Sequence, residues 1–139
     1  MIVVAIIGIL ASVAIPQYQN YILRTDATNS LSAARPLQLA VSEYASRYSK
    51  LPATAQDLND YTGISVTAGD HAVGKVAEVA VAANGVLTVK FANSTDVPAE
   101  LQDKTYDLVP TISSSGATAW TSRKGTSDPI DDKFLPKLK

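Results

Sequence analysis

Residues 1–23, with the sequence MIVVAIIGILASVAIPQYQNYIL, contain no charged side chain, and the first charge along the chain is Arg24. The most apolar part, residues 1–15, would reach about 22 Å as an α-helix. A bilayer hydrocarbon core is about 30 Å thick and needs roughly 20 apolar residues. Such a run suits a buried helix, the core of a signal peptide, or a membrane helix that lacks its first turns.

The signal-peptide alternative rests on the small residues Ser12 and Ala14, where a peptidase cleaves. No Lys or Arg precedes the apolar run, and the helical pattern continues past this point. A mature chain beginning at Ile15 would support this alternative, which would make the protein a secreted binding domain or enzyme.

The apolar run contains several small residues and two residues, Gly8 and Pro16, that weaken a helix. Ala5, Gly8 and Ser12 recur at steps of three and four, which lets helices approach one another closely. Pro16 removes one backbone donor and displaces the carbonyl one turn earlier. We therefore expect the stretch from Gly8 to Pro16 to bend or melt most easily.

After Pro16 the pattern becomes amphipathic. Apolar side chains recur at steps of three and four at Ala27, Leu31, Ala34, Leu37, Val41, Tyr44 and Tyr48. The pattern predicts one helix from Met1 to about Ser49, roughly 70 Å long, with a kink at Pro36. A helix of this length must project from a domain of this size, and its uncharged half needs either a membrane or other copies of the chain.

The C-terminal half predicts an antiparallel sheet. Two alternating stretches, residues 76–83 and 86–92, flank Asn84-Gly85, the favoured pair for a type I′ hairpin turn. Further strands are expected at residues 105–109 and 117–123, and a short helical turn at residues 55–61. The predicted fold class is α+β, with the second half of the long helix packed on a four-stranded antiparallel sheet. The predicted core comprises Leu31, Leu37, Val41, Tyr44, Leu87, Val89, Phe91, Trp120 and Phe134.

The run Ala14-Ile-Pro-Gln-Tyr-Gln-Asn-Tyr21 closely resembles the N-terminal segment of type IV pilins, within a match over residues 1–25. The sequence around Leu108, Gly116 and Trp120 is also similar to the pilin sheet. The resemblance implies residues 1–23 as membrane anchor and filament core, residues 24–139 as a globular head, and a homopolymer as the working form. It implies assembly contacts at Met1, Val4, Ala5, Ile7, Gly8, Ser12, Ile15, Pro16, Tyr18 and Tyr21.

The same resemblance implies the partners and the location. Subunits would wait in the inner membrane, meet the pilus assembly machinery, and end outside the cell as a surface pilus. A host surface or DNA would be the fibre's external partner, serving adhesion, surface motility or DNA uptake. The nearest rival is a pseudopilin of a type II secretion system, but Gln17-Tyr18-Gln19-Asn20-Tyr21 favours the pilus.

Two family features are missing from this sequence. Pilins begin several residues before the position of Met1, with an N-methylated aromatic residue, a glutamate and an upstream basic leader. We therefore expect the chain to be N-terminally incomplete. Pilins also close a C-terminal loop with a disulfide, whereas Ser122 occupies one cysteine position and the chain has no cysteine at all.

The remaining motifs favour a protein without catalysis or cofactor. His71 is the only histidine and lies beside Asp70 in a loop. The run from Ser113 to Gly116 is a turn and lacks the glycine spacing of a nucleophile elbow. Weak alternatives are a calcium site at Asp128, Asp131 and Asp132, and DNA binding through the basic residues Arg123, Lys124, Lys133, Lys137 and Lys139. The net charge of −1 produces no general attraction to nucleic acid or to anionic lipid.

Overall fold

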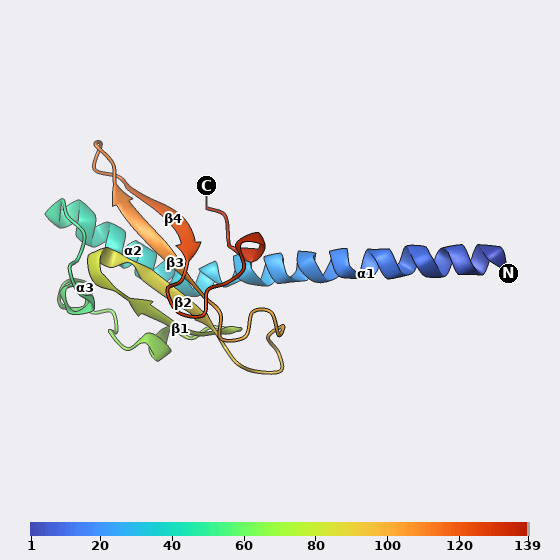
Figure 1. The fold of residues 1–139 in the computed structure, drawn as a ribbon. Helices are drawn as coiled ribbons and strands as arrows, with labels where there is room; N and C mark the ends of the chain where they lie inside the picture. Colours follow the sequence, from blue (N-terminus) through green and yellow to red (C-terminus); the bar gives the residue numbers. More distant parts are fainter. Residues whose placement is uncertain (139) are drawn as a thin grey trace.

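The protein is a long helix that carries a small α+β head at one end (Figure 1). The structure is a computed structural model that describes residues 1–138, and of residues 13–17 it describes the backbone alone. The elements are α1 (Ile2–Asn29), α2 (Leu31–Tyr48), α3 (Ala55–Thr62), η1 (Ala68–His71), β1 (Val76–Val81), η2 (Ala83–Gly85), β2 (Leu87–Phe91), β3 (Thr105–Ile112), β4 (Thr118–Lys124) and η3 (Asp132–Phe134).

The predicted single helix is divided in two at Ser30. α1 ends at Asn29 and α2 begins at Leu31, with the Ala33 N–H donating to the Ser30 carbonyl in a tighter, 3₁₀-type bond. Pro36 lies inside α2. It has no N–H to donate to the carbonyl four residues earlier, that of Ser32, which lies inside α2 and after the break.

The predicted sheet is confirmed. Its four antiparallel strands follow chain order β1-β2-β3-β4. At the first hairpin both Asn84 (φ 60°) and Gly85 (φ 73°) lie in the left-handed region, as a type I′ turn requires. Val81 pairs with Leu87 directly beside this turn, and Leu87 pairs with Leu108 on the next strand.

The core forms between α2 and one face of this sheet, as the hydrophobic pattern predicted. Leu37 and Val41 on α2 and Leu87, Val89 and Phe91 on β2 are fully buried. Leu31 and Tyr44 are also buried. Trp120 is the exception among the residues predicted for the core, because it packs against the cluster but stays partly exposed on the edge strand β4.

The short helix expected at residues 55–61 is present as α3, and a capping box explains its start. The Thr54 hydroxyl accepts from the Asp57 N–H, and the Asp57 carboxylate accepts from the Thr54 N–H. Leu58 is the residue of α3 that is buried in the core. Gly63 then ends the helix in the left-handed conformation that glycine adopts without steric cost.

Candidate assembly surface

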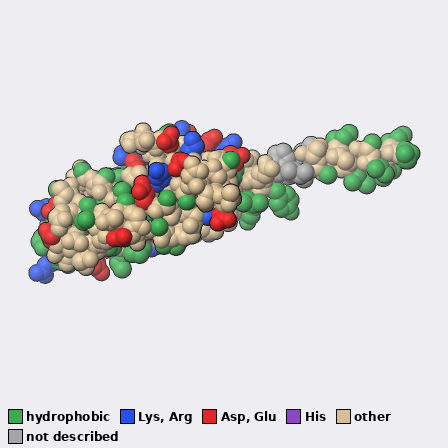
Figure 2. All heavy atoms as spheres, turned by 90° about the horizontal axis from the view of Figure 1, so that it is seen from below, with side chains coloured by type: hydrophobic (Ala, Val, Ile, Leu, Met, Phe, Trp, Pro, Cys, Tyr) green, Lys and Arg blue, Asp and Glu red, His purple; other side chains and the backbone are tan. Residues whose placement is uncertain are grey.

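The candidate site is the part of α1 that projects beyond the head (Figure 1). Residues 1–12 and 18–22 are exposed, and Leu23 is the first buried side chain along the chain's described residues. Most of these exposed side chains are apolar, and Figure 2 shows apolar side chains at both ends of the projecting segment. So much exposed apolar surface on one helix marks a site that a membrane or a partner covers.

The predicted assembly residues lie on this surface wherever the structure describes their side chains. Ile7 is 60% exposed, and Tyr18 and Tyr21 are 71% exposed. Met1, Val4, Ala5, Gly8 and Ser12 are exposed as well. The side chains of Ile15 and Pro16 fall outside the described residues.

The small-residue positions leave room for close contact. A side chain built on Gly8 would meet nothing within 4 Å, so this point of the helix is open to a neighbour. Ser12 donates its hydroxyl to the Ile9 carbonyl at 2.7 Å. Because that hydroxyl already has a partner, Ser12 can be covered by apolar groups without leaving a buried polar atom unpaired.

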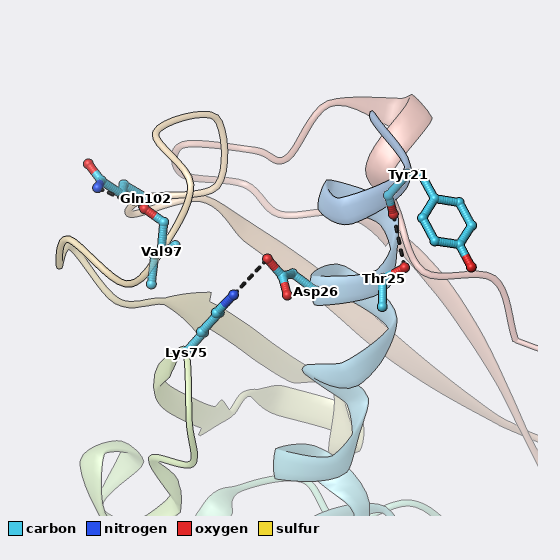
Figure 3. A network of polar contacts seen from close by, with 6 residues as sticks. All are labelled: Tyr21, Thr25, Asp26, Lys75, Val97 and Gln102. Atoms are coloured by element: carbon cyan, nitrogen blue, oxygen red, sulfur yellow. Dashed lines mark hydrogen bonds and ion pairs between the residues drawn. The ribbon is translucent and has the colours of Figure 1, made fainter. Parts of the chain in front are cut away.

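Thr25 makes the same kind of bond as Ser12, because its hydroxyl donates to the carbonyl of Tyr21 one turn earlier at 2.9 Å (Figure 3). In the same view Lys75, which directly precedes β1, reaches across to Asp26 on α1 with an Nζ–Oδ2 distance of 2.8 Å. The side-chain amide of Gln102 donates to the Val97 and Ser94 carbonyls and so stabilises the neighbouring loop. The Lys75–Asp26 pair is the contact of this group that joins α1 to the sheet, close to where the projecting segment leaves the head.

A buried polar contact fixes the junction between α1 and α2. The Ser30 hydroxyl donates to the Ala27 carbonyl and is also hydrogen-bonded to the Tyr106 hydroxyl on β3. Burial raises the pKa of the Tyr106 phenol above its ordinary value, and the Ser30 bond opposes that rise. Sequence reasoning missed this pair, because a polar residue at the helix break and a tyrosine far along the chain carry no local signal of contact.

Asp107 was likewise not predicted as a buried residue. It is 3% exposed, accepts from Thr88 on β2 at 2.8 Å and pairs with Arg123 on β4 at 3.1 Å. The three residues form one cross-strand row, because Thr88 and Arg123 are its direct register partners. The carboxylate thereby links three strands.

The C-terminal segment is tied down without a disulfide. Phe134 is 3% exposed, and Ile130 is fully buried. Ser122, at the expected cysteine position, donates its hydroxyl to the Pro136 carbonyl. Gly125 lies so close to the Thr105 side chain that a Cβ there would collide with it. Packing and hydrogen bonds therefore hold the same loop that a disulfide would close.

The three candidate calcium ligands do not form a common site. Within the described residues no group of three or more His, Asp or Glu side chains is placed to hold a metal ion. Asp132 pairs with Lys124 at 3.1 Å and Asp131 with Lys133 at 4.0 Å. Asp128 adopts a positive φ of 44° in the turn before Pro129. Asp131 and Asp132 are therefore paired with nearby lysines and do not face a shared metal position.

The other candidate residues have ordinary structural partners. His71 closes the short helix η1, and its Nε2 lies 2.9 Å from the Ser65 carbonyl. Of the basic residues considered for DNA, Arg123, Lys124 and Lys133 are paired with carboxylates as above, Lys137 is exposed, and Lys139 lies outside the described residues. Along the described residues, no helix combines the length and the apolar character needed to cross a membrane.

The structure thus combines a small head with a projecting, uncharged helix whose exposed side chains are mostly apolar. A model of the pilin family, described as a bacterial filament protein, matches residues 24–138. Fimbrial protein EcpC of Eikenella corrodens is 38% identical over 98% of this chain and 82% of its own length. The type IV major fimbrial protein FimA of Dichelobacter nodosus is 30% identical over 98% of this chain and 88% of its own.

The type IV major pilin protein PilE of Neisseria gonorrhoeae is 35% identical over 78% of this chain, which spans 60% of that relative's length. The chain belongs to the pilin family and, with these relatives, to its type IV pilins. The names of these relatives favour a pilus subunit over the type II pseudopilin considered from the sequence.

Proposed function

We propose that this protein is the major structural subunit of a type IV pilus and polymerises through the exposed apolar segment of α1. The observation that carries this proposal is the exposure of the uncharged residues 2–12 and 18–22, which are the residues of this segment whose side chains the structure describes. Burying such side chains is favourable by roughly 25 cal/mol per Å² of apolar area. Copies of α1 packed side by side along a fibre axis remove this surface from water and leave the heads outside.

Before assembly, the same segment serves as an anchor in the inner membrane. Residues 1–23 carry no charged side chain, and the one hydroxyl near their middle, on Ser12, bonds back to the helix. The segment is then transferred from lipid to the filament core by the assembly machinery, and the mature location is the outside of the cell. The head, residues 24–139, remains in water in both states.

The finished fibre serves adhesion, surface motility or DNA uptake, with a host surface or DNA as its outer partner. The role is structural and not enzymatic. Relatives named as major pilin and major fimbrial proteins support this assignment. The division into an anchor and a head is supported by Leu23, which is the first buried side chain among those that the structure describes.

Ile7→Asp tests polymerisation. Ile7 is exposed in the single chain, so the isolated subunit should fold normally, whereas an uncompensated carboxylate inside a helix bundle costs several kcal/mol. We expect no fibres by electron microscopy or by sedimentation from cells that express this variant. Lys50→Asp, an equally exposed position beyond the end of α2, is the matched control and should form fibres. Normal fibres from Ile7→Asp would overturn the proposal that this face is buried.

A further inference from the structure

Three cationic side chains gather where α1 leaves the head. Arg24 is the first charged residue after the uncharged run, Lys133 lies in η3, and Lys137 follows in the C-terminal segment. Figure 1 shows η3 and this segment beside α1 at the end of the head that faces the projecting helix. The three residues line a pocket of about 330 Å³ together with Thr28, Asp132 and Phe134.

Contacts within the structure hold two of these cations, Arg24 and Lys133, in place. The Arg24 Nε donates to the Lys133 carbonyl at 3.1 Å, which ties α1 to η3. The Lys133 ammonium lies 5.0 Å from the centre of the Phe134 ring and 4.0 Å from Asp131 Oδ2. Asp132, the carboxylate that lines the pocket, is paired with Lys124. Among the described residues, Arg24 and Lys137 have no carboxylate partner, whereas Lys133 and Asp132 are each paired, so the pocket keeps an excess of positive charge.

The position of Arg24 along the helix selects the kind of anion. Residues 1–23 carry no charged side chain, and Arg24 is the first charge that follows them. Charged side chains are costly inside the hydrocarbon core and lie at its boundary with water. When the uncharged segment lies in the membrane, Arg24 and the pocket beside it therefore lie at the level of the lipid phosphates.

We propose that Arg24, Lys133 and Lys137 bind the phosphate of an anionic lipid headgroup while the subunit waits in the membrane. This inference rests on the proposed membrane stage. A guanidinium donates two parallel hydrogen bonds to a phosphate, and ammonium groups add point charges that follow its oxygens. The contact fixes how deeply α1 is inserted and how the head is rotated over the bilayer.

The test compares the full-length chain, reconstituted from detergent, in phosphatidylcholine vesicles with and without phosphatidylglycerol. The affinity for the vesicles is measured by flotation. We expect phosphatidylglycerol to raise it roughly tenfold at low salt, with most of the gain lost at high salt. The variant Arg24→Gln/Lys133→Gln/Lys137→Gln should keep its binding to neutral vesicles and lose the gain.

The control variant Arg35→Gln/Arg47→Gln/Lys50→Gln removes the same charge from exposed positions on α2 and directly after it, and should behave as the native chain. Lys137→Gln alone should lose part of the gain without touching the Arg24–Lys133 bond, which guards against a variant that misfolds. Circular dichroism checks the head in each case.

The outcomes separate the two proposals. No binding to neutral vesicles by the native chain would overturn the membrane stage itself. Binding to neutral vesicles without any gain from phosphatidylglycerol would overturn the headgroup site alone, as would an equal gain in the control and pocket variants. Inorganic phosphate that abolishes the gain at millimolar concentration would assign the pocket to free phosphate instead. A pocket variant that keeps the lipid gain but forms no fibres would assign the pocket to a contact between subunits.

Discussion

Replacing Phe134 by alanine tests whether packing has taken the place of the missing disulfide. The ring is 3% exposed and belongs to the same buried cluster as Ile130 and the sheet residues. Loss of its transfer free energy accounts for about 1.5–3 kcal/mol. The cavity left behind raises the usual cost of Phe→Ala to about 3–5 kcal/mol.

Collapse of the loop into that cavity is restricted on both sides. The Phe134 N–H donates to the Asp131 carbonyl at 2.9 Å, and the Lys133 carbonyl is held by Arg24 at 3.1 Å. Ser122 then holds the Pro136 carbonyl a short distance further on. The segment cannot move freely toward the sheet, so we expect a cost of at least about 3 kcal/mol.

The assay is thermal unfolding of the full chain in non-ionic detergent, followed by near-ultraviolet circular dichroism. For a head of this size a loss of about 3 kcal/mol lowers the melting temperature by roughly 10 °C. Leu39→Ala is the matched control, because Leu39 is exposed and its truncation should change stability by no more than about 0.5 kcal/mol. A Phe134→Ala variant that melts within 2–3 °C of the native chain, by this same scaling, would refute the reasoning.

Three further predictions concern the phenol, the anchor and the fibre. Burial raises the pKa of Tyr106 in the folded protein, so the neutral phenol contributes its full stability below the unfolded pKa of about 10 and loses that contribution as the pH rises further. The stability of Tyr106→Phe should therefore depend less on pH in the alkaline range than that of the native chain. Tyr18→Phe is the control and should behave as the native chain. Deleting residues 1–23 should leave a soluble monomer whose circular dichroism shows helix and sheet, and an unfolded fragment would contradict a self-sufficient head. In the assembled fibre, the stretch from Gly8 to Pro16 should lose helical hydrogen bonds, and a filament reconstruction with an unbroken α-helix there would rule this out.

Local signals in the sequence were sufficient to predict the helical N-terminal half, the short helix α3 and the four strands, although not the break at Ser30. The uncharged residues 1–23 need a membrane or other copies of the chain to cover them. Their projection from the head was predicted because a helix of about 70 Å is longer than a domain of this size. Asn84-Gly85 determines its turn because both residues tolerate a positive φ. Thr54 and Asp57 set the start of α3 through hydrogen bonds between residues three apart.

Only the tertiary structure determined which distant groups meet. Ser30 at the helix break meets Tyr106, the buried Asp107 meets Arg123 from the neighbouring strand, and the pocket at Arg24 forms where η3 lies against α1. None of these residues differs in type from the polar residues around it. Their partners lie many positions away in the chain, so only the three-dimensional arrangement of helix, sheet and C-terminal segment brings each donor to its acceptor. The same reason left Trp120 half exposed: the sequence shows that it is large and apolar, but its place on the edge strand of the sheet was decided by the order of the strands.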